Sequence, residues 1–551
     1  MPGPALRDHS GGRAVNLRRA GEYWARPLPE GFARWYWPVF AVATSCLVLA
    51  LSTVWVLGHP YPTGWDKAQY NSQLLSDAAC VQAEGLVGVG KVLLCSDTAR
   101  PPAFRVFVLP VILTLGVSPI ALRFVSLVFF PITLLFIYLA AARVGGRVAG
   151  AFAVLALASC PEIVSATQTF GTEYPLYLAT AATLYYLAAN WDRREGSARD
   201  WIGLGLALGL GAWSKASFAL IGGPAVLLTL VLSRRKAFRG PGVGFLVKSV
   251  FLAAILAAPW WLLNGREAIR YAWYASNFVR HSIGSTFGEV LVNWPLKLTL
   301  RTAGPLLTLL VLAVLLTPLL SAIAKRKTGM SHGQSASLWL GLLTPVPLVL
   351  AHLLGSNHNM RLLSPALVPF AVAFGVVAGQ TSWSRARPLA AGVTVAICLQ
   401  LVMMAQPLVY PQGVLTVRCT DHPSLYSPSA DRPGDEESGA ASLVQAVAAK
   451  NPIQAMAARP QWDWQVLREK CRSLGMDNPS IGYLGNYYAF NEAQIKNAWL
   501  RHGETVKVEW LWRYDGARFD WAGIEKLLAD KDVVLTIPEI RGRRLYVSGG
   551  A

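Results

Sequence analysis

A series of long apolar runs constrains the fold most, because a chain with many such runs has to bury them in a bilayer. Apolar residues make up 53% of the 551 residues and charged residues 15%. That balance is too apolar for one soluble globule and is typical of polytopic membrane proteins. The predicted spans are 37–58, 119–141, 146–162, 174–189, 201–213, 216–232, 246–263, 299–323, 336–353, 362–380 and 388–405.

The basic residues between these runs predict the topology. The formal net charge is +19, and in membrane proteins short basic loops favour the cytoplasmic side. With about eleven spans and the N-terminus inside, every basic cluster falls on that side. No motif that reads RNA or DNA is present, so we expect no nucleic-acid partner. The clusters are Arg143/Arg147, Arg193/Arg194/Arg199, Arg234/Arg235/Lys236/Arg239, Lys325/Arg326/Lys327 and Arg385/Arg387.

This topology divides the chain into four parts. Residues 1–35 form a basic cytoplasmic tail, and no small-residue cleavage site follows, so the first run is an uncleaved anchor. Residues 36–405 form the α-helical membrane domain and 406–440 a linker. Residues 441–551 contain no further apolar run and are predicted to form a small extracytoplasmic α/β domain. Its strands are expected at 481–488, 506–512 and 533–537, and a helix at 521–529.

Two features of the outside loops need their own interpretation. Segment 103–117 is apolar but short, and counting it as a span would place the later basic clusters outside. We therefore expect a helix lying in the outer interface, with a re-entrant hairpin as the alternative. An oxidising compartment would permit a disulfide between Cys80 and Cys95, and another between Cys419 and Cys471.

An acidic residue follows the first span, in the stretch Tyr61-Pro-Thr-Gly-Trp-Asp-Lys-Ala-Gln-Tyr70. Asp66 is thus expected at the outer membrane face. A carboxylate there suits a general base that accepts a proton from a hydroxyl group. The alternative is a solvated loop aspartate beside Lys67.

Several more ionisable residues stand at the outer ends of predicted spans. Arg123, Lys215 and Arg361 would each cost about 2.5–3.5 kcal/mol within a span, so such residues are usually functional. The alternative is snorkelling to lipid headgroups. Glu173 opens a span, where it would either stabilise a helix N-terminus or bind a divalent ion together with Asp66.

Several of these residues lie in motifs that resemble one family. The first part of the chain looks like the beginning of GT-C glycosyltransferases. The resemblance there is carried by Asp66, Arg100-Pro-Pro102 and Gly116-Val-Ser-Pro-Ile-Ala-Leu-Arg123. The most similar branch comprises the dolichyl-phosphate-mannose protein mannosyltransferases (glycosyltransferase family 39) and the aminoarabinose transferase of lipid A. The resemblance covers about 36–405. Its further motifs are Thr172-Glu-Tyr-Pro175, Gly211-Ala-Trp-Ser-Lys215, Pro259-Trp-Trp261 and Arg361-Leu-Leu-Ser-Pro365.

The sequence departs from the family pattern at three points. Lys67 follows Asp66, where protein mannosyltransferases have an Asp-Glu pair, and this leaves the acceptor open. The family's His-Pro-Pro is Arg-Pro-Pro here. The Trp-Trp-Asp-Tyr-Gly block of oligosaccharyltransferases is absent from the sequence, which argues against en bloc oligosaccharide transfer.

The resemblance implies transfer of a hexose or pentose from a polyprenyl-phosphate donor to a hydroxyl of a glycan, lipid or protein. Asp66 would be the base, and cations would stabilise the departing lipid phosphate. Those cations would come from Lys215, Arg361 and Arg123, with His358 beside them. A divalent metal ion (Mg²⁺ or Mn²⁺) at Asp66 and Glu173 is a further expectation.

The expected compartment is a bacterial inner membrane with a periplasmic active face, where membrane lipids are also partners. A lipid or glycan transporter or flippase is the main alternative, but transporters place ionisable residues near the bilayer midplane and often contain repeats. A scaffold that displays the C-terminal domain is the third possibility, and so many spans exceed what a scaffold needs.

Overall fold

The structure is a computed structural model, and it describes most of the membrane domain and part of the C-terminal region. The described residues are 30–58, 65–116, 118–168, 170–191, 196–234, 240–277, 287–298, 332–355, 357–358, 360–380, 464–484, 492–511, 514–515, 518–519 and 521–536, with 304, 308, 312 and 395 singly.

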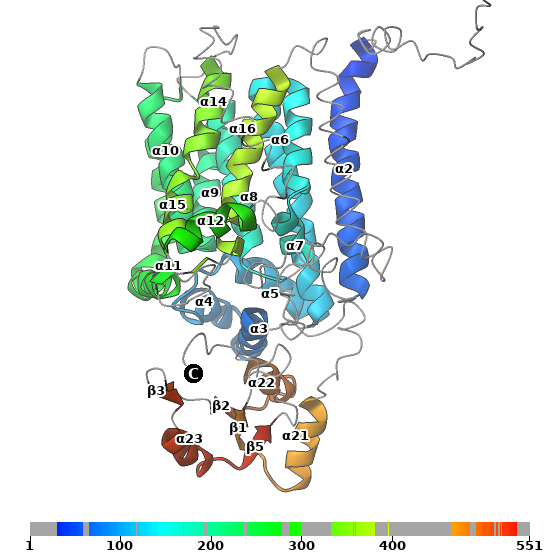
Figure 1. Cartoon of the computed structure of the whole chain (residues 1–551), viewed down its shortest axis with the longest axis vertical. Helices are drawn as coiled ribbons and strands as arrows, with labels where there is room; N and C mark the ends of the chain where they lie inside the picture. Colours follow the sequence, from blue (N-terminus) through cyan, green and yellow to red (C-terminus); the bar gives the residue numbers. More distant parts are fainter. Residues whose placement is uncertain are drawn as a thin grey trace, which may run out of the picture.

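A helical bundle forms the first of three layers (Figure 1). Within the described part of the chain, five stretches are long and apolar enough to cross a membrane. They are Trp35–Val54, Ile120–Ala158, Ala216–Arg234, Val243–Asn277 and Gly333–Leu354. The bundle helices are α2 (Glu30–Gly58), α6 (Pro119–Ala158), α8 (Glu173–Ala189), α9 (Ala198–Ser214), α10 (Ala219–Ser233), α11 (Val243–Asn277), α14 (His332–Leu343), α15 (Val346–Leu354) and α16 (Leu367–Gln380).

Helix α6 contains two of the predicted spans, and its chain reverses between them. Gly146 has φ 79° and ψ 178°, a backbone conformation that glycine adopts without steric cost. A Cβ on Gly150 would lie 2.8 Å from the Tyr138 ring. Residues this far apart in one straight helix would be about 18 Å apart. The two halves therefore pack against each other, as the separate runs 119–141 and 146–162 predict.

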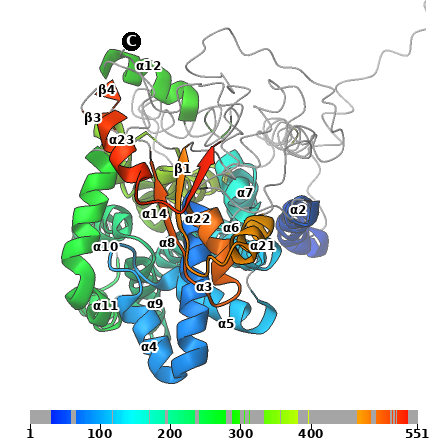
Figure 2. The same cartoon turned by 90° about the horizontal axis from the view of Figure 1, so that it is seen from below.

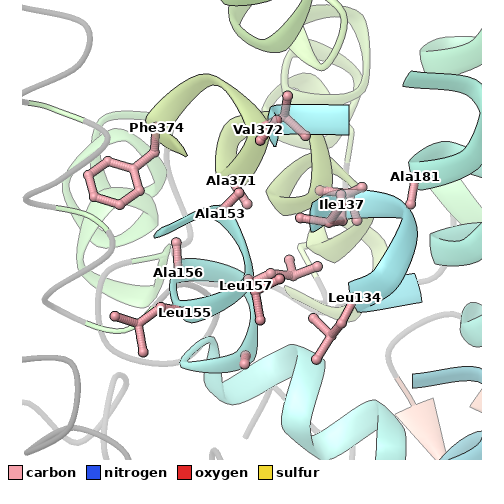
Figure 3. Packing of buried hydrophobic residues seen from close by; sticks show 14 of the residues in the cluster. Leu134, Ile137, Ala153, Leu155, Ala156, Leu157, Ala181, Ala371, Val372 and Phe374 are labelled. Carbon is pink, nitrogen blue, oxygen red and sulfur yellow. The ribbon is translucent and has the colours of Figure 1, made fainter. Parts of the chain in front are cut away.

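The core of the bundle depends on close approach between α6 and α16. Gly375 and Gly379 lie one turn apart on α16, and a Cβ on Gly379 would lie 2.7 Å from the Gly145 carbonyl oxygen. Small residues at this spacing let two helix backbones pack closely inside a membrane. Figure 3 shows Ala153 of α6 beside Ala371 of α16, with larger aliphatic side chains filling the space around them.

Three shorter helices form a second layer at one end of the bundle (Figure 1): α3 (Trp65–Glu84), α4 (Leu86–Cys95) and α5 (Ala103–Leu115). Helix α5 occupies the segment expected to lie in the membrane interface. With 13 residues it is about 20 Å long, too short to cross a bilayer. A short helix, α7 (Pro161–Gln168), follows α6 at the same end.

The disulfide between Cys80 and Cys95 is not formed, since both thiols are free. A Cβ on Gly88 would lie 2.5 Å from the Cys80 carbonyl oxygen, so Cys80 is level with Gly88 in the α3–α4 hairpin. Cys95 is two turns further along α4, about 10 Å away. A disulfide needs Cα atoms about 4.4–6.8 Å apart. Cys471 is also a free thiol, and Cys419 lies outside the described residues.

The third layer is a small α/β unit, seen from below in Figure 2. Strands β1 (Ser480–Leu484), β2 (Lys507–Trp510) and β5 (Val533–Thr536) form a parallel sheet in the order β2-β1-β5. Each overlaps a predicted strand, and α23 (Trp521–Leu528) overlaps the predicted helix. The other elements are α21 (Trp464–Ser473), α22 (Glu492–Leu500), β3 (Tyr514–Asp515) and β4 (Arg518–Phe519).

Some sequence predictions fall outside the described residues. These include span 388–405 apart from residue 395, most of span 299–323, the tail 1–29 and the linker 406–440. The number of spans and the four-part division of the chain therefore stay predictions.

A buried ion network joins α3 to α5. The Arg105 side chain is 1% exposed, and its Nε donates to Asp77 Oδ2 at 2.8 Å. Its Nη2 lies 3.5 Å from Asp97 Oδ2 and donates to Gln73 Oε1 at 3.2 Å. Removing one partner of a buried ion pair is strongly destabilising, because the other charge is left uncompensated. The network therefore fixes the layer that covers the end of the bundle.

We expect Arg105→Met to destabilise the purified protein by about 3–5 kcal/mol, because buried Asp77 loses its cation and Asp97 keeps only the looser pair with Arg100. Thermal unfolding in detergent measures the change. Arg270→Met is the matched control, since the Arg270 side chain is 79% exposed and its ion pair with Glu267 is loose. Equal unfolding temperatures for Arg105→Met and Arg270→Met would contradict a stabilising role for the network.

Candidate active site

Glu173 lies at the centre of a three-residue ion cluster at the end of the bundle. Lys215 Nζ donates to its Oε1 at 3.2 Å, and Arg361 Nε lies 3.3 Å from the same oxygen. We call these three residues the Glu173 cluster. The Glu173 cluster brings together residues of three motifs that are far apart in the sequence. The roles of these residues at a donor phosphate stay predictions.

The local sequence explains why the first two members stand where they do. Glu173 is the first residue of α8, where the helix dipole favours a negative charge. Lys215 is extended, with φ −165° and ψ 143°, between α9 and the 3₁₀ helix η1 (Ala216–Phe218). A Cβ on Gly211 would clash with the Phe218 ring. Glycine at 211 therefore lets the chain turn sharply at Lys215.

Arg361 is held by two residues that sequence reasoning missed. It lies in η3 (Met360–Leu362), just before η4 (Ser364–Ala366). Ser364 Oγ donates to the Arg361 carbonyl at 2.6 Å, and Tyr177 Oη lies 2.5 Å from Ser364 Oγ. Tyr177 is one turn beyond Glu173 on α8, so α8 positions both the carboxylate and the loop that carries its guanidinium partner. Their spacing of four residues, which places Glu173 and Tyr177 on the same face of a helix, was the sequence feature that could have indicated Tyr177.

The charges of the Glu173 cluster are unevenly exposed. The Glu173 side chain is 6% exposed, whereas those of Lys215 and Arg361 are 26% and 15% exposed. Two cations share one anion, so one positive charge is in excess and reaches the surface. An anion such as a phosphate is attracted to partly buried cations in this arrangement more strongly than to solvated ones.

The other two predicted phosphate ligands lie in different surroundings. Arg123 is buried in the first turns of α6. His358 is buried, with Nε2 3.4 Å from the Leu353 carbonyl and its ring edge-on to His352 at 5.8 Å. His352 accepts a hydrogen bond from Trp294 Nε1 on α12 (Phe287–Lys297). The roles of Arg123 and His358 at a phosphate stay predictions.

Asp66 lies in the first turn of α3, and its side chain is outside what the structure describes. One turn further on, Tyr70 is buried against Phe104 and Phe170, with ring centroids 5.3 and 6.2 Å away. Phe170 precedes Glu173 by three residues. The beginning of α3 is therefore packed against the segment that leads into α8, and contact between Asp66 and the Glu173 cluster stays a prediction.

Arg100 of the Arg-Pro-Pro motif connects α3 to the end of α11. Its guanidinium carbon lies 4.9 Å from the Tyr70 ring centre and 5.1 Å from that of Tyr271, and its Nη2 donates to Tyr271 Oη at 2.9 Å. Burial opposes its charge, but Tyr70, Tyr271 and Asp97 outweigh that effect and raise the pKa of Arg100. Arg100 therefore stays charged and holds the two helices together.

A metal fits the described residues poorly. Among them, no three His, Cys, Asp or Glu side chains group together. Glu173 has two cationic neighbours within 3.3 Å, and a divalent ion in their place would meet strong repulsion. The divalent ion at Asp66 and Glu173 stays a prediction.

Comparisons with known proteins show a family match for part of the chain and a shared fold. Residues 99–263 match the family described as dolichyl-phosphate-mannose-protein mannosyltransferase. The computed structure resembles that of ArnT from Cupriavidus metallidurans bound to undecaprenyl phosphate, with a TM-score of 0.53 and 16% identity over 86% of both chains. The GT-C resemblance is confirmed.

Two further solved structures are less similar. The apo state of ArnT from Cupriavidus metallidurans has a TM-score of 0.49 and 14% identity over 86% of each chain. The oligosaccharyltransferase of Archaeoglobus fulgidus has a TM-score of 0.44 and 13% identity, covering 84% of this chain and 62% of that one. A search of curated proteins finds no match to this chain.

The family match covers only part of the candidate site. Arg100, Arg123, Glu173 and Lys215 lie within the matched residues 99–263. Asp66 and Arg361 lie outside them, and only the tertiary structure brings Arg361 to the matched segment that carries Glu173.

Proposed function

We propose that this protein is a membrane glycosyltransferase that moves a sugar from a polyprenyl-phosphate donor to an acceptor hydroxyl. The Glu173 cluster is the observation that carries the proposal, because it presents two fixed, partly exposed cations at one end of an apolar bundle. The family match over 99–263 and the fold shared with ArnT support it.

In the proposed reaction, Lys215 and Arg361 bind the donor phosphate. The bond between the anomeric carbon and the phosphate oxygen breaks, and the two cations stabilise the charge that develops on the leaving group. The acceptor oxygen forms the new bond to the anomeric carbon, and its proton passes to Asp66. A single displacement of this kind inverts the anomeric centre.

The two cations need to be fixed before the donor arrives, because preorganised charges cost no rearrangement during the reaction. Glu173 fixes the positions of both cations by binding them. Tyr177 and Ser364 further restrain Arg361 by holding its loop. Lys215 is oriented by the break between α9 and η1.

The finer parts of the proposal concern topology and partners. We place the active face and the C-terminal domain on the periplasmic side of a bacterial inner membrane, with about eleven spans, because that arrangement puts the basic loops in the cytoplasm. Arg123 and His358 are proposed as additional phosphate ligands. Chelators test the predicted divalent ion at Asp66 and Glu173. The acceptor is a glycan, lipid or protein.

Binding of undecaprenyl phosphate to the purified protein in nanodiscs tests the proposed site. We expect Lys215→Ala and Arg361→Ala each to weaken binding by about 10–100-fold, because a hydrogen bond to a charged group contributes about 1.5–3 kcal/mol. Arg270→Ala is the control, since it removes an exposed cation of α11 that is not part of the Glu173 cluster.

Transfer is assayed with a panel of undecaprenyl-phosphate-linked monosaccharides, beginning with mannose. Unchanged lipid binding in both variants would remove Lys215 and Arg361 from the donor site. Binding without transfer, together with movement of a fluorescent polyprenyl phosphate across a proteoliposome membrane, would favour the transporter alternative.

A further inference from the structure

Helix α3 joins two parts of the molecule. Its first turn carries Asp66, the proposed base, and it also contacts the C-terminal unit through α22. Many of its residues are polar, and the Asn71-Ser-Gln73 stretch lies in its middle. Tyr70, Leu74 and Ala78 lie one turn apart and are buried in one core with residues of α5 and α6, so they hold one face of α3 against the bundle. The polar residues beside them need contacts of another kind.

Helix α22 of the C-terminal unit supplies such a contact. It packs against α3 in both views of the molecule (Figures 1 and 2). Ser72 Oγ donates to Asn497 Oδ1 at 2.9 Å, across a sequence separation of 425 residues. Asn71 and Asn497 are each only 2% exposed, and the Ser72–Asn497 hydrogen bond shows that α22 lies against this part of α3.

Helix α22 is itself firmly attached to the C-terminal unit. Ile495 and Trp499 on it are fully buried in the core beside Ile481 of β1. A movement of the C-terminal sheet is therefore transmitted to Asn497, and from Asn497 to α3.

The contact between α3 and α22 leaves some buried polar atoms without hydrogen bonds. The Asn71 Oδ1 and Asn497 Nδ2 atoms are buried and have no hydrogen-bond partner among the described residues. Buried amide groups without partners are costly, so such an interface is weaker than its buried area suggests.

We propose that the C-terminal unit positions the catalytic helix: docking of α22 through Asn497 and Ser72 holds the first turn of α3, and thus Asp66, in place for turnover. This rests on the proposed function. Asn497 and Ser72 are positioning residues in this scheme, since they act through α3 and touch no substrate. Donor binding at Lys215 and Arg361 is independent of the contact.

Hydrogen–deuterium exchange of the full chain in nanodiscs tests the holding of α3 directly. We expect Asn497→Ala to increase amide exchange in 65–75 by about tenfold, because a helix that loses its docking contact opens more often. Lys496→Ala is the matched control, since Lys496 pairs with Glu492 within α22. Equal exchange in Asn497→Ala and the unaltered protein would overturn the proposal.

Kinetics test the consequence for the reaction, with whichever donor of the panel is transferred. We expect Asn497→Ala to lower kcat about tenfold while KM for the donor stays within about twofold, because misplacing a catalytic group affects turnover rather than donor binding. In the double variant Ser72→Cys and Asn497→Cys, oxidation to a disulfide should restore kcat. Reduction of that disulfide should lower kcat again. A raised acceptor KM with unchanged kcat would instead make the unit an acceptor-binding domain and overturn the proposal.

The two proposals fail in different ways. If no donor of the panel is transferred and undecaprenyl phosphate does not bind, the proposed function fails, whereas the exchange of 65–75 still decides whether α22 holds α3. If donor transfer is normal and Asn497→Ala changes neither exchange nor kcat, the proposed function stands and the positioning role is wrong.

Discussion

Asp66→Asn should abolish measurable sugar transfer and leave expression, membrane insertion and undecaprenyl phosphate binding unaltered. An amide has nearly the size of the carboxylate but cannot accept the proton of the acceptor hydroxyl. General-base catalysis contributes about 10²–10⁴-fold to rate, so kcat should fall by that factor. Donor binding should be retained, because the phosphate contacts belong to Lys215 and Arg361. The measurement is transfer of radiolabelled sugar with binding assayed in parallel.

The same helix offers a matched control for this variant. Glu84 is the last residue of α3, and its partly exposed side chain pairs with Lys91. Glu84→Gln removes one carboxylate from α3 at the end remote from Asp66 and should leave kcat unchanged. Asp66→Glu should recover part of the activity, because it restores a base at a slightly different position. Full activity of Asp66→Asn would show that another group accepts the proton.

Glu173→Gln should bind undecaprenyl phosphate more tightly and turn over more slowly. The substitution removes the only anion of the Glu173 cluster, so its two cations attract the lipid phosphate without competition. They also lose the carboxylate that fixes them, and loss of one preorganised electrostatic contact typically costs about 10²–10³-fold in kcat. A more strongly held product phosphate slows turnover further. Binding and single-turnover assays separate the two effects.

The direction of the change in affinity distinguishes two roles for Glu173. If Glu173 and Asp66 held a divalent ion that bridges to the phosphate, Glu173→Gln would weaken binding, and a chelator would weaken binding to the unaltered protein as well. Tighter binding that is insensitive to chelator supports the cation-pairing role seen here. Glu267→Gln is the control, because Glu267 is exposed on α11 and pairs loosely with Arg270.

Local sequence was sufficient to predict several elements. Hydropathy predicted the runs that became α2, α8, α10 and α11, and the two runs around Gly146 correctly indicated two packed segments. It also predicted a short helix at 103–117, which corresponds to α5, because a segment of that length is too short to span a bilayer. These predictions succeeded because hydropathy and helix length depend on residues close together in the chain.

Other predictions failed or were missed for a geometric reason. The permitted Cys80–Cys95 bridge is absent because α3 and α4 form a hairpin that holds the two residues at different heights. Arg105 was missed as a buried cation, since nothing in its apolar surroundings shows that Asp77 and Asp97 face it. Tyr177 and Ser364 were missed because their hydroxyl groups are ordinary in isolation.

The sequence by itself determined which residues are apolar enough for the membrane, and which motifs resemble GT-C glycosyltransferases. Only the tertiary structure decided that Lys215 and Arg361 share the carboxylate of Glu173, and that α22 covers α3. The contacts behind this arrangement are Glu173–Lys215, Tyr177–Ser364 and Ser72–Asn497. They join residues that are 42, 187 and 425 positions apart in the sequence, respectively. Hydropathy is a property of neighbouring residues, whereas pairing across such separations is set by how whole helices pack.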